Sequence, residues 1–286
     1  MINTKTGLCG LLGHPVEHSA SPSMHNAAFK ELGLNYIYLA FDVGKNQLGK
    51  AVGGLRALNV KGFNVTIPHK VDIIHLLDGL DPLADKIQAV NTIVNNNGKL
   101  IGYNTDASGF LEALIASGFK PEGKKVALLG AGGGARAIAF ILAQSGANLS
   151  IINRRQEYEL AVNLATSIAL NFKIDVSALE LNDKSLKSQI AAADLLINAT
   201  PLGMFPDINK SPVPAVLLHD GLTVFDIVYN PLETMLMKEA KQAGARTVSG
   251  LDMLVRQGAL AFKMWTGRPA PLEVMKKEAL KALKIK

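Results

Sequence analysis

The chain has 286 residues, enough for about two domains that each bury a hydrophobic core. Apolar residues make up 48% of it and charged residues 19%, which excludes a disordered or fibrous chain. The 30 Lys and Arg outnumber the 24 Asp and Glu, a mild excess that favours anionic ligands; without a dense basic run or many aromatic residues, we expect no nucleic-acid partner.

The single cysteine and the amino terminus both bear on the cellular compartment. Cys9 has no second cysteine in the chain to pair with, which is typical of a reducing environment. Its apolar neighbours predict a buried strand residue and not a nucleophile. The first residues lack the charged and then apolar pattern of a signal peptide, and no apolar run predicts a membrane span. We therefore expect a cytoplasmic protein with no membrane partner.

The first third of the chain alternates short apolar runs with segments of helical periodicity. This alternation predicts strands at 7–12, 36–43 and 62–67, and helices at 21–33 and 47–58. Ser21 is the expected N-cap of the first helix, because Pro22 after it suits the first helical position. The run Asn-Asn-Asn-Gly98, between predicted strands at 90–94 and 100–103, has the turn chemistry of a β-hairpin.

A second unit begins near Asp106 and continues the alternation. Its predicted strands lie at 124–130, 148–153, 194–199 and 223–228. Its predicted helices pass through 110–114 and cover 135–144 and 156–169, and the tail from Gly250 onward is helical as well. This order predicts an α/β fold with a doubly wound parallel sheet and right-handed crossovers.

A glycine-rich turn predicts a dinucleotide site. The sequence Gly130-Ala131-Gly132-Gly133-Gly134-Ala135 fits the pattern G-x-G-x-x-A, and it lies between a predicted strand and a predicted helix. In that context the glycines let the backbone approach a pyrophosphate, which accepts hydrogen bonds from the exposed N–H groups of the helix. A tight strand-to-helix turn without a ligand is the alternative.

The end of the next strand predicts which dinucleotide binds. Sites for NAD usually place an acid there to bind the ribose 2′-hydroxyl, whereas arginine accommodates the 2′-phosphate of NADP. Asn153, Arg154, Arg155 and Gln156 include two arginines and no acid, so the predicted cofactor is NADP. Two solvent-exposed arginines at a strand end are the alternative.

Several polar residues fall at other strand ends, where ligands bind in α/β proteins. Ser19 and Ser21 lie beside a helix start, so their hydroxyl and N–H groups can donate to one carboxylate. A proline turn presents Lys70, and Asp106 follows the strand at 100–103. Lys70 as a surface cation and Asp106 as a helix N-cap would have no catalytic role. In a cleft, however, a lysine and a carboxylate can transfer a proton.

Three histidines near the amino terminus raise the question of a metal. His14, His18 and His25 lie in and beside a proline-containing loop, without a cysteine or a regular acidic partner. We expect no metal site there.

Taken together, these motifs resemble the shikimate dehydrogenase family, which includes the quinate/shikimate dehydrogenases, over nearly the whole chain. The resemblance rests on His18-Ser-Ala-Ser-Pro22 with His25-Asn26, Asn64-Val-Thr-Ile-Pro-His-Lys70, Ala89-Val-Asn-Thr92, Gly102-Tyr-Asn-Thr-Asp106, Gly130-Ala-Gly-Gly-Gly-Ala135, Asn198-Ala-Thr-Pro-Leu-Gly-Met204, Asp226-Ile-Val-Tyr-Asn-Pro231 and Gly250-Leu-Asp-Met-Leu-Val-Arg-Gln257.

The resemblance implies an α/β fold of two domains. An α/β substrate domain would comprise residues 1–105 and 251–286, and a Rossmann-type doubly wound NADP domain residues 106–250. It implies NADP-linked, reversible reduction of 3-dehydroshikimate to shikimate in aromatic amino acid biosynthesis, by a monomer or a homodimer. A quinate/shikimate dehydrogenase that uses NAD or both cofactors is an alternative, and a non-catalytic dinucleotide sensor is another.

The resemblance also implies roles for individual residues. Lys70 and Asp106 would be catalytic. The substrate would be bound by Ser19, Ser21, Thr66, Lys70, Asn91, Asp106, Tyr229 and Gln257. Besides the glycine turn and 153–155, the cofactor would contact Thr200, Met204, Ile227 and Gly250.

The sequence departs from the family pattern at a few positions. Gln88 stands where glycine is usual, which puts the local backbone geometry in question. Arg155 and Tyr158 replace a usual threonine and a usual basic residue. Asn-Arg-Arg resembles the quinate/shikimate branch, in which an aspartate follows, but Gln156 is found here.

Overall fold

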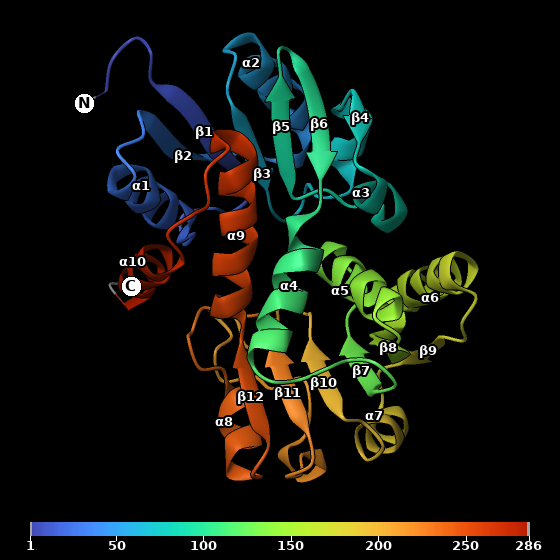
Figure 1. Ribbon diagram of the computed structural model, residues 1–286. Helices are drawn as coiled ribbons and strands as arrows, with labels where there is room; N and C mark the ends of the chain where they lie inside the picture. Colours follow the sequence, from blue (N-terminus) through green and yellow to red (C-terminus); the bar gives the residue numbers. More distant parts are fainter. Residues whose placement is uncertain (1, 285–286) are drawn as a thin grey trace. The chain divides into compact units, whose positions relative to one another are not determined.

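The computed structural model describes residues 2–284, which form two compact units. Unit 1 comprises the residues up to 109 and from 255 onward, and unit 2 comprises residues 110–254. Each unit is built on one six-stranded sheet with helices packed on it (Figure 1). The limits of the units fall inside two helices, α4 (Thr105–Ala116) and α9 (Gly250–Thr266).

Sheet A, in unit 1, is parallel except for one strand. Its order is β2 (Tyr36–Asp42), β1 (Gly7–Gly13), β3 (Gly62–Val65), β5 (Thr92–Asn96), β6 (Lys99–Tyr103) and β4 (Gly79–Leu80). Only β5 runs antiparallel to its neighbours β3 and β6. The carboxyl ends of β1, β3 and β6 and the amino end of β5 therefore meet at one edge, which we call the carboxyl edge of sheet A.

Apolar side chains hold the helices of unit 1 on its sheet. Besides parts of α4 and α9, these helices are α1 (Ser21–Glu31), α2 (Leu48–Ala57), α3 (Pro82–Ile87) and α10 (Leu272–Lys284). Phe63, Ile73 and Ile93 are fully buried in one core cluster. Helix α10 packs against α1. Asp81 starts α3, because its carboxylate accepts hydrogen bonds from the N–H groups of Leu83 and Ala84.

Sheet B, in unit 2, is wholly parallel. Its order is β12 (Arg246–Ser249), β11 (Thr223–Asp226), β10 (Leu195–Asn198), β7 (Lys125–Leu129), β8 (Asn148–Asn153) and β9 (Ser177–Glu180). The strand order reverses between β7 and β10, and such a switch point is where α/β proteins bind nucleotides, outside the carboxyl ends of the strands. We call this side the carboxyl edge of sheet B.

The helices of unit 2 connect these strands. They are α5 (Gly133–Gln144), α6 (Tyr158–Phe172), α7 (Asp183–Ile190) and α8 (Met235–Gln242). The central strands β7, β10 and β11 are buried as near-continuous apolar runs, with Leu196 and Val224 fully buried, as expected of a parallel sheet covered on both faces. Across residues 2–284, no helix combines the length and the apolar character needed to cross a membrane.

Most elements lie where the sequence predicts them. Strand β8 covers 148–153 as predicted. The hairpin of β5 and β6 is confirmed, and its two-residue loop is Asn97-Gly98, both with positive φ, as a hairpin of matching twist requires. Cys9 is fully buried in β1, and burial raises the pKa of its thiol to about 12, so the predicted buried residue is confirmed.

The predicted N-cap of the first helix is wrong by one residue. Helix α1 begins at Ser21 itself, Ala20 is the capping residue, and the Ser21 hydroxyl makes no capping hydrogen bond. The Ser21 N–H instead donates to Ser19 Oγ at 3.2 Å. Pro22 then lies within the first turn, where the absence of an N–H costs no helical hydrogen bond.

Gln88, where the family pattern has glycine, adopts a glycine-like backbone. Its φ is 55° and its ψ is 39°, so it ends α3 in the left-handed conformation. A residue with a Cβ carries some strain there, which glycine avoids. The backbone geometry of the turn is thus that of a glycine, although the residue is not.

Candidate functional site

A charged pair stands at the carboxyl edge of sheet A. Lys70 follows β3 through the turn at Pro68, and its Nζ lies 2.6 Å from Asp106 Oδ2. The two side chains are only 18% and 8% exposed, so water screens the pair less than it screens a surface pair. Asp106 is the second residue of α4, and the capping contact comes from Asn104, whose Oδ1 accepts from the Ala107 N–H at 3.1 Å. The N-cap alternative for Asp106 is therefore wrong.

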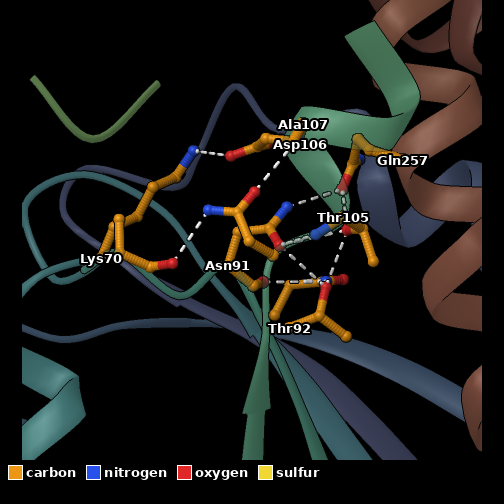
Figure 2. Close-up of polar contacts among 10 residues, drawn as sticks. Lys70, Asn91, Thr92, Thr105, Asp106, Ala107 and Gln257 are labelled. Atoms are coloured by element: carbon orange, nitrogen blue, oxygen red, sulfur yellow. Dashed lines mark hydrogen bonds and ion pairs between the residues drawn. The ribbon is translucent and has the colours of Figure 1, made fainter. Parts of the chain in front are cut away.

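A network of amides and hydroxyls lies beside this pair (Figure 2). Asn91 Oδ1 accepts from the Thr105 N–H at 2.7 Å and from its hydroxyl at 3.1 Å. Asn91 Nδ2 donates to Gln257 Oε1 at 3.3 Å, and Thr92 Oγ1 lies 2.9 Å from Thr105 Oγ1. These contacts fix which side of the Asn91 amide carries its oxygen, so the site presents donors and acceptors in a set order.

A second layer of polar side chains supports this network, and the sequence did not reveal its role. Asn64, buried in β3, donates from Nδ2 to the Asn91 carbonyl at 3.1 Å and to Thr92 Oγ1 at 2.9 Å. Its Oδ1 accepts from the Tyr38 hydroxyl at 2.8 Å. The feature of the sequence that could have indicated this role is an asparagine within an apolar strand, because a buried amide requires hydrogen-bond partners.

Ser19, Ser21 and Thr66 occupy the same edge of sheet A without joining the network. Ser19 and Ser21 come after the end of β1, and Thr66 after the end of β3, where its N–H donates to the Leu12 carbonyl at 2.9 Å. Within residues 2–284, no hydrogen bond links their side chains to Lys70 or to the amides.

The glycine turn follows β7 in unit 2 and fits a dinucleotide. Gly130 has φ +102°, and a Cβ on it would lie 3.0 Å from the Ala199 carbonyl oxygen, so glycine is required there. A Cβ on Gly132 would meet no atom within 4 Å and would instead occupy the space before α5. Gly132 precedes the first residue of α5, so the free N–H groups of the helix point toward that space.

The arginines after β8 are exposed, and one has an acidic partner that the sequence interpretation overlooked. Arg154 is 63% exposed, and its Nη2 lies 2.5 Å from Glu157 Oε1. This hydrogen bond lowers the pKa of the Glu157 carboxyl and raises that of Arg154. Asn153 Nδ2 donates to the Glu157 carbonyl at 2.8 Å, which holds the turn in shape. Glu157 directly follows Gln156, the last residue of the segment predicted to contain no acid.

The remaining predicted cofactor residues line the carboxyl edge of sheet B. Thr200 follows β10, Ile227 follows β11 and Gly250 follows β12. Met204 lies in the turn after Thr200 and is 42% exposed. Tyr229, predicted to be near the substrate, lies in unit 2, two residues beyond Ile227.

The amino-terminal histidines have separate surroundings. His14 Nδ1 lies 2.6 Å from Asp42 Oδ1 at the surface. His25 is fully buried and stacks on Tyr38 with a ring-centroid distance of 4.4 Å, and burial lowers its pKa to about 3. In the described part of the chain, no three His, Cys, Asp or Glu side chains gather in a way that could hold a metal ion.

Comparison with known proteins identifies the family. A model of the shikimate dehydrogenase substrate binding domain matches residues 11–93, and a model of the shikimate 5′-dehydrogenase C-terminal domain matches residues 250–280. A shikimate dehydrogenase (NADP(+)) of Moorella thermoacetica is 50% identical over 96% of this chain and 92% of its own length. The chain belongs to the shikimate dehydrogenase family.

Solved structures of the family agree in fold. A shikimate dehydrogenase crystallised with NADP+ has a TM-score of 0.91 at 47% identity, over 99% of this chain and 98% of its own. A shikimate 5-dehydrogenase of Listeria monocytogenes, in complex with shikimate and NAD, has a TM-score of 0.90 at 40% identity, over 96% and 97%. The two-domain Rossmann-type fold expected from the resemblance is confirmed.

Proposed function

We propose that this protein catalyses the reversible, NADP-linked reduction of 3-dehydroshikimate to shikimate in aromatic amino acid biosynthesis. The observation that carries this proposal is the largely buried pair of Lys70 and Asp106, which lies beside the amide network in a chain of the shikimate dehydrogenase family. Unit 1 would bind the substrate, and unit 2 would bind the cofactor.

Lys70 would be the proton donor and Asp106 its partner. When bound, NADPH supplies the hydride that reduces the ring ketone. As the carbonyl oxygen gains negative charge it requires a proton, and the Lys70 ammonium group can donate one. The 2.6 Å contact with Asp106 orients the Lys70 Nζ. In the direction of shikimate oxidation, neutral Lys70 accepts the hydroxyl proton.

The substrate would be bound mainly by side chains at the carboxyl edge of sheet A. The hydroxyl groups of Ser19 and Ser21 would donate to its carboxylate. Its ring hydroxyls would contact Thr66, Asn91, Asp106 and Gln257, with Tyr229 nearby. The proposal is supported by the sheet topology, because the segments around β1, β3, β5 and β6 reach the same edge. It is also supported by the ordered amides of Asn91 and Gln257, since fixed donors and acceptors distinguish stereoisomers of a polyol.

The cofactor would lie along the carboxyl edge of sheet B. The turn Gly130–Ala135 would bind the pyrophosphate, and Asn153, Arg154 and Arg155 the adenosine ribose with its 2′-phosphate. Thr200, Met204, Ile227 and Gly250 would line the nicotinamide. The exposure of Arg154 supports this assignment, because a guanidinium group at the surface can reorient toward a phosphate.

The proposal extends to the location and the assembly of the protein. A cytoplasmic enzyme is supported by the buried, thiol-bearing Cys9 and by the need for NADP(H) as co-substrate. We propose a monomer or a homodimer, and the elution volume of the purified protein in gel filtration distinguishes the two.

A turnover assay tests the proposed reaction. Purified protein is incubated with shikimate and NADP, and the absorbance of NADPH is followed. We expect steady production of NADPH that requires both compounds, and loss of it in Lys70→Ala. Binding of NADPH without any turnover of shikimate would contradict the proposal and favour a dinucleotide-sensing protein.

A further inference from the structure

Asn198 and Asp226 form a buried polar pair that the reaction itself does not use. They end the neighbouring parallel strands β10 and β11, are register partners, and are both fully buried. Asn198 Nδ2 donates to Asp226 Oδ1 at 3.0 Å. A buried carboxylate costs stability unless donors surround it, so its presence at this position calls for an explanation.

Asp226 ties together three segments. Its Oδ1 accepts from Asn198 and from the Val228 N–H at 3.0 Å. Its Oδ2 accepts from the hydroxyl of Thr234 at 2.7 Å, and Thr234 is the N-cap of α8. The carboxylate thus fixes the loop 227–234 at both of its ends. Burial raises the Asp226 pKa to about 6, so the group is mainly ionised at neutral pH.

Asn198 organises the loop after β10 in the same way. Its Oδ1 accepts from the N–H of Thr200 at 3.1 Å and from its hydroxyl at 2.7 Å. Its Nδ2 also donates to the Leu202 carbonyl at 3.1 Å. The two loops then meet, because the Phe205 N–H donates to the Asn230 carbonyl at 3.1 Å.

We propose that Asn198 and Asp226 are positioning residues for the nicotinamide end of the cofactor. The proposal rests on the proposed function, which places Thr200, Met204 and Ile227 beside the nicotinamide. The pair holds the two loops that carry these residues in one fixed arrangement, with Asn198 shaping the first loop, Asp226 the second, and their mutual hydrogen bond joining them. Neither side chain contacts substrate or cofactor itself.

The variant Asn198→Asp tests the positioning role, because it replaces an amide by a carboxylate of nearly the same shape. Asn198→Asp places two carboxylates in contact and removes the donor to Leu202, so the loops separate or one acid takes up a proton. We expect the KM for NADP and the Kd for NADPH, measured by its fluorescence, to rise at least about tenfold. The KM for shikimate should change by less than about twofold, because the shikimate groups lie mainly in unit 1.

Two further variants separate positioning from folding. Asp226→Asn keeps an acceptor for Asn198 and for Val228 and loses only the acceptor for Thr234, so NADPH binding should weaken less than in Asn198→Asp. In the double variant Asn198→Asp/Asp226→Asn the like charges are gone, and part of the lost NADPH affinity should return. Thermal unfolding of each variant is measured beside binding. Weaker NADPH binding in a variant with the Tm of the wild-type protein supports positioning, whereas weaker binding that appears only together with a lower Tm indicates loss of the fold.

Thr234→Val keeps the test decisive if Asn198→Asp does not fold. This change removes one donor to Asp226 at constant shape, and the same change at Thr223, at the other end of β11, is the matched control. We expect weaker NADPH binding for Thr234→Val and unchanged binding for Thr223→Val. Wild-type affinity in folded Asn198→Asp or Thr234→Val overturns the positioning role. Failure of the wild-type protein to bind NADPH overturns the proposed function instead.

Discussion

The carboxyl edges of the two sheets present their functional groups in different ways. At sheet A the groups are side chains, mostly buried and joined to one another, as in the contacts of Lys70 with Asp106 and of Asn91 with Gln257. At sheet B they are backbone N–H groups before α5 and exposed guanidinium groups such as that of Arg154.

This difference suits the two ligands. A small ring with several hydroxyl groups is distinguished by a fixed set of donors and acceptors, which a packed network provides. A long anionic dinucleotide is held by its phosphates, for which backbone donors and mobile cations are sufficient. Changes at the edge of sheet A should therefore affect turnover most, and changes at the edge of sheet B should affect cofactor choice.

The largest effect is expected from Lys70→Ala. General acid–base catalysis contributes about 10²–10⁴ to a rate, so kcat should fall by that order. The Kd for NADPH should stay nearly unchanged, since Lys70 belongs to unit 1. Steady-state kinetics and NADPH fluorescence measure the two quantities. Lys124→Ala, which removes an exposed lysine paired with Asp194, is the control. Near-normal turnover in Lys70→Ala would remove this residue from the mechanism.

Stability should respond to acid with opposite signs in the two units. The pKa of His25 is lowered from 6.5 to about 3 by burial, so its contribution to stability is complete above pH 6.5 and is lost as the pH falls toward 3. The pKa of Asp226 is raised from 3.8 to about 6, chiefly by burial, so its contribution is complete below pH 3.8 and is lost as the pH rises through 6.

Denaturant unfolding between pH 4 and 7 tests these signs. His25→Phe should reduce the loss of stability in acid by on the order of a few kcal/mol, because one pKa unit corresponds to about 1.4 kcal/mol. Asp226→Asn should steepen that loss, because it removes the contribution that grows as the pH falls. Variants with the pH slope of the wild-type protein would show that neither group is responsible.

The next largest change is expected in shikimate binding when Ser19 or Ser21, the proposed partners of its carboxylate, is replaced. A hydroxyl group that donates to a charged ligand contributes about 1.5–3 kcal/mol, so Ser19→Ala should raise the KM for shikimate by roughly tenfold or more. Ser21→Ala should weaken shikimate binding as well, without the cost of a lost helix cap, because the Ser21 hydroxyl does not cap α1. Ser23→Ala, exposed in the same helix, is the control. If neither Ser19 nor Ser21 affects KM, the carboxylate binds elsewhere.

Cofactor choice should depend on Arg154. With a charged hydrogen bond at about 1.5–3 kcal/mol, the wild-type protein should prefer NADP over NAD by at least roughly tenfold in kcat/KM. Arg154→Ala should remove most of this preference while NAD kinetics change little. The ratio of kcat/KM for the two cofactors is the measurement, and a variant that retains the wild-type ratio would contradict the assignment.

The smallest effect is expected from Glu157→Gln. If Arg154 binds the 2′-phosphate as proposed, the Glu157 carboxylate would compete with that phosphate, but the pair is exposed, so water screens it and the effect is small. The preference for NADP should therefore rise by about two- to fivefold. Glu159→Gln, which removes one negative charge two residues further on, should leave the ratio unchanged. A fall in NADP preference for Glu157→Gln would mean that Glu157 helps to hold Arg154 for the phosphate.

The sequence predicted those parts of the fold that depend on local pattern. Apolar runs bounded by turn residues revealed β1 and β8, and Asn97-Gly98 revealed the hairpin. Strand β9 was missed because its four residues are exposed or half-buried at the edge of sheet B, so no apolar run marks it. Helix α7 was missed although Asn182 and Ser185 form a capping box, because the third residue is serine and not the usual acid or amide.

For the site, the sequence predicted residues but not their contacts. Lys70 and Asp106 could be singled out from strand ends, and the structure brings them together at 2.6 Å. The contact of Asn91 with Gln257 joins residues 166 positions apart, which no local pattern reveals. Glu157 was overlooked because its side chain returns to Arg154 only through the turn 155–157.

Four initial rates, measured with shikimate or quinate as the substrate and NADP or NAD as the cofactor, test the proposed substrate and cofactor together. We expect the highest kcat/KM for shikimate with NADP, at least roughly tenfold above shikimate with NAD, and a lower value for quinate with either cofactor. Equal use of NAD and NADP, or a preference for quinate, would contradict it and favour a quinate/shikimate dehydrogenase.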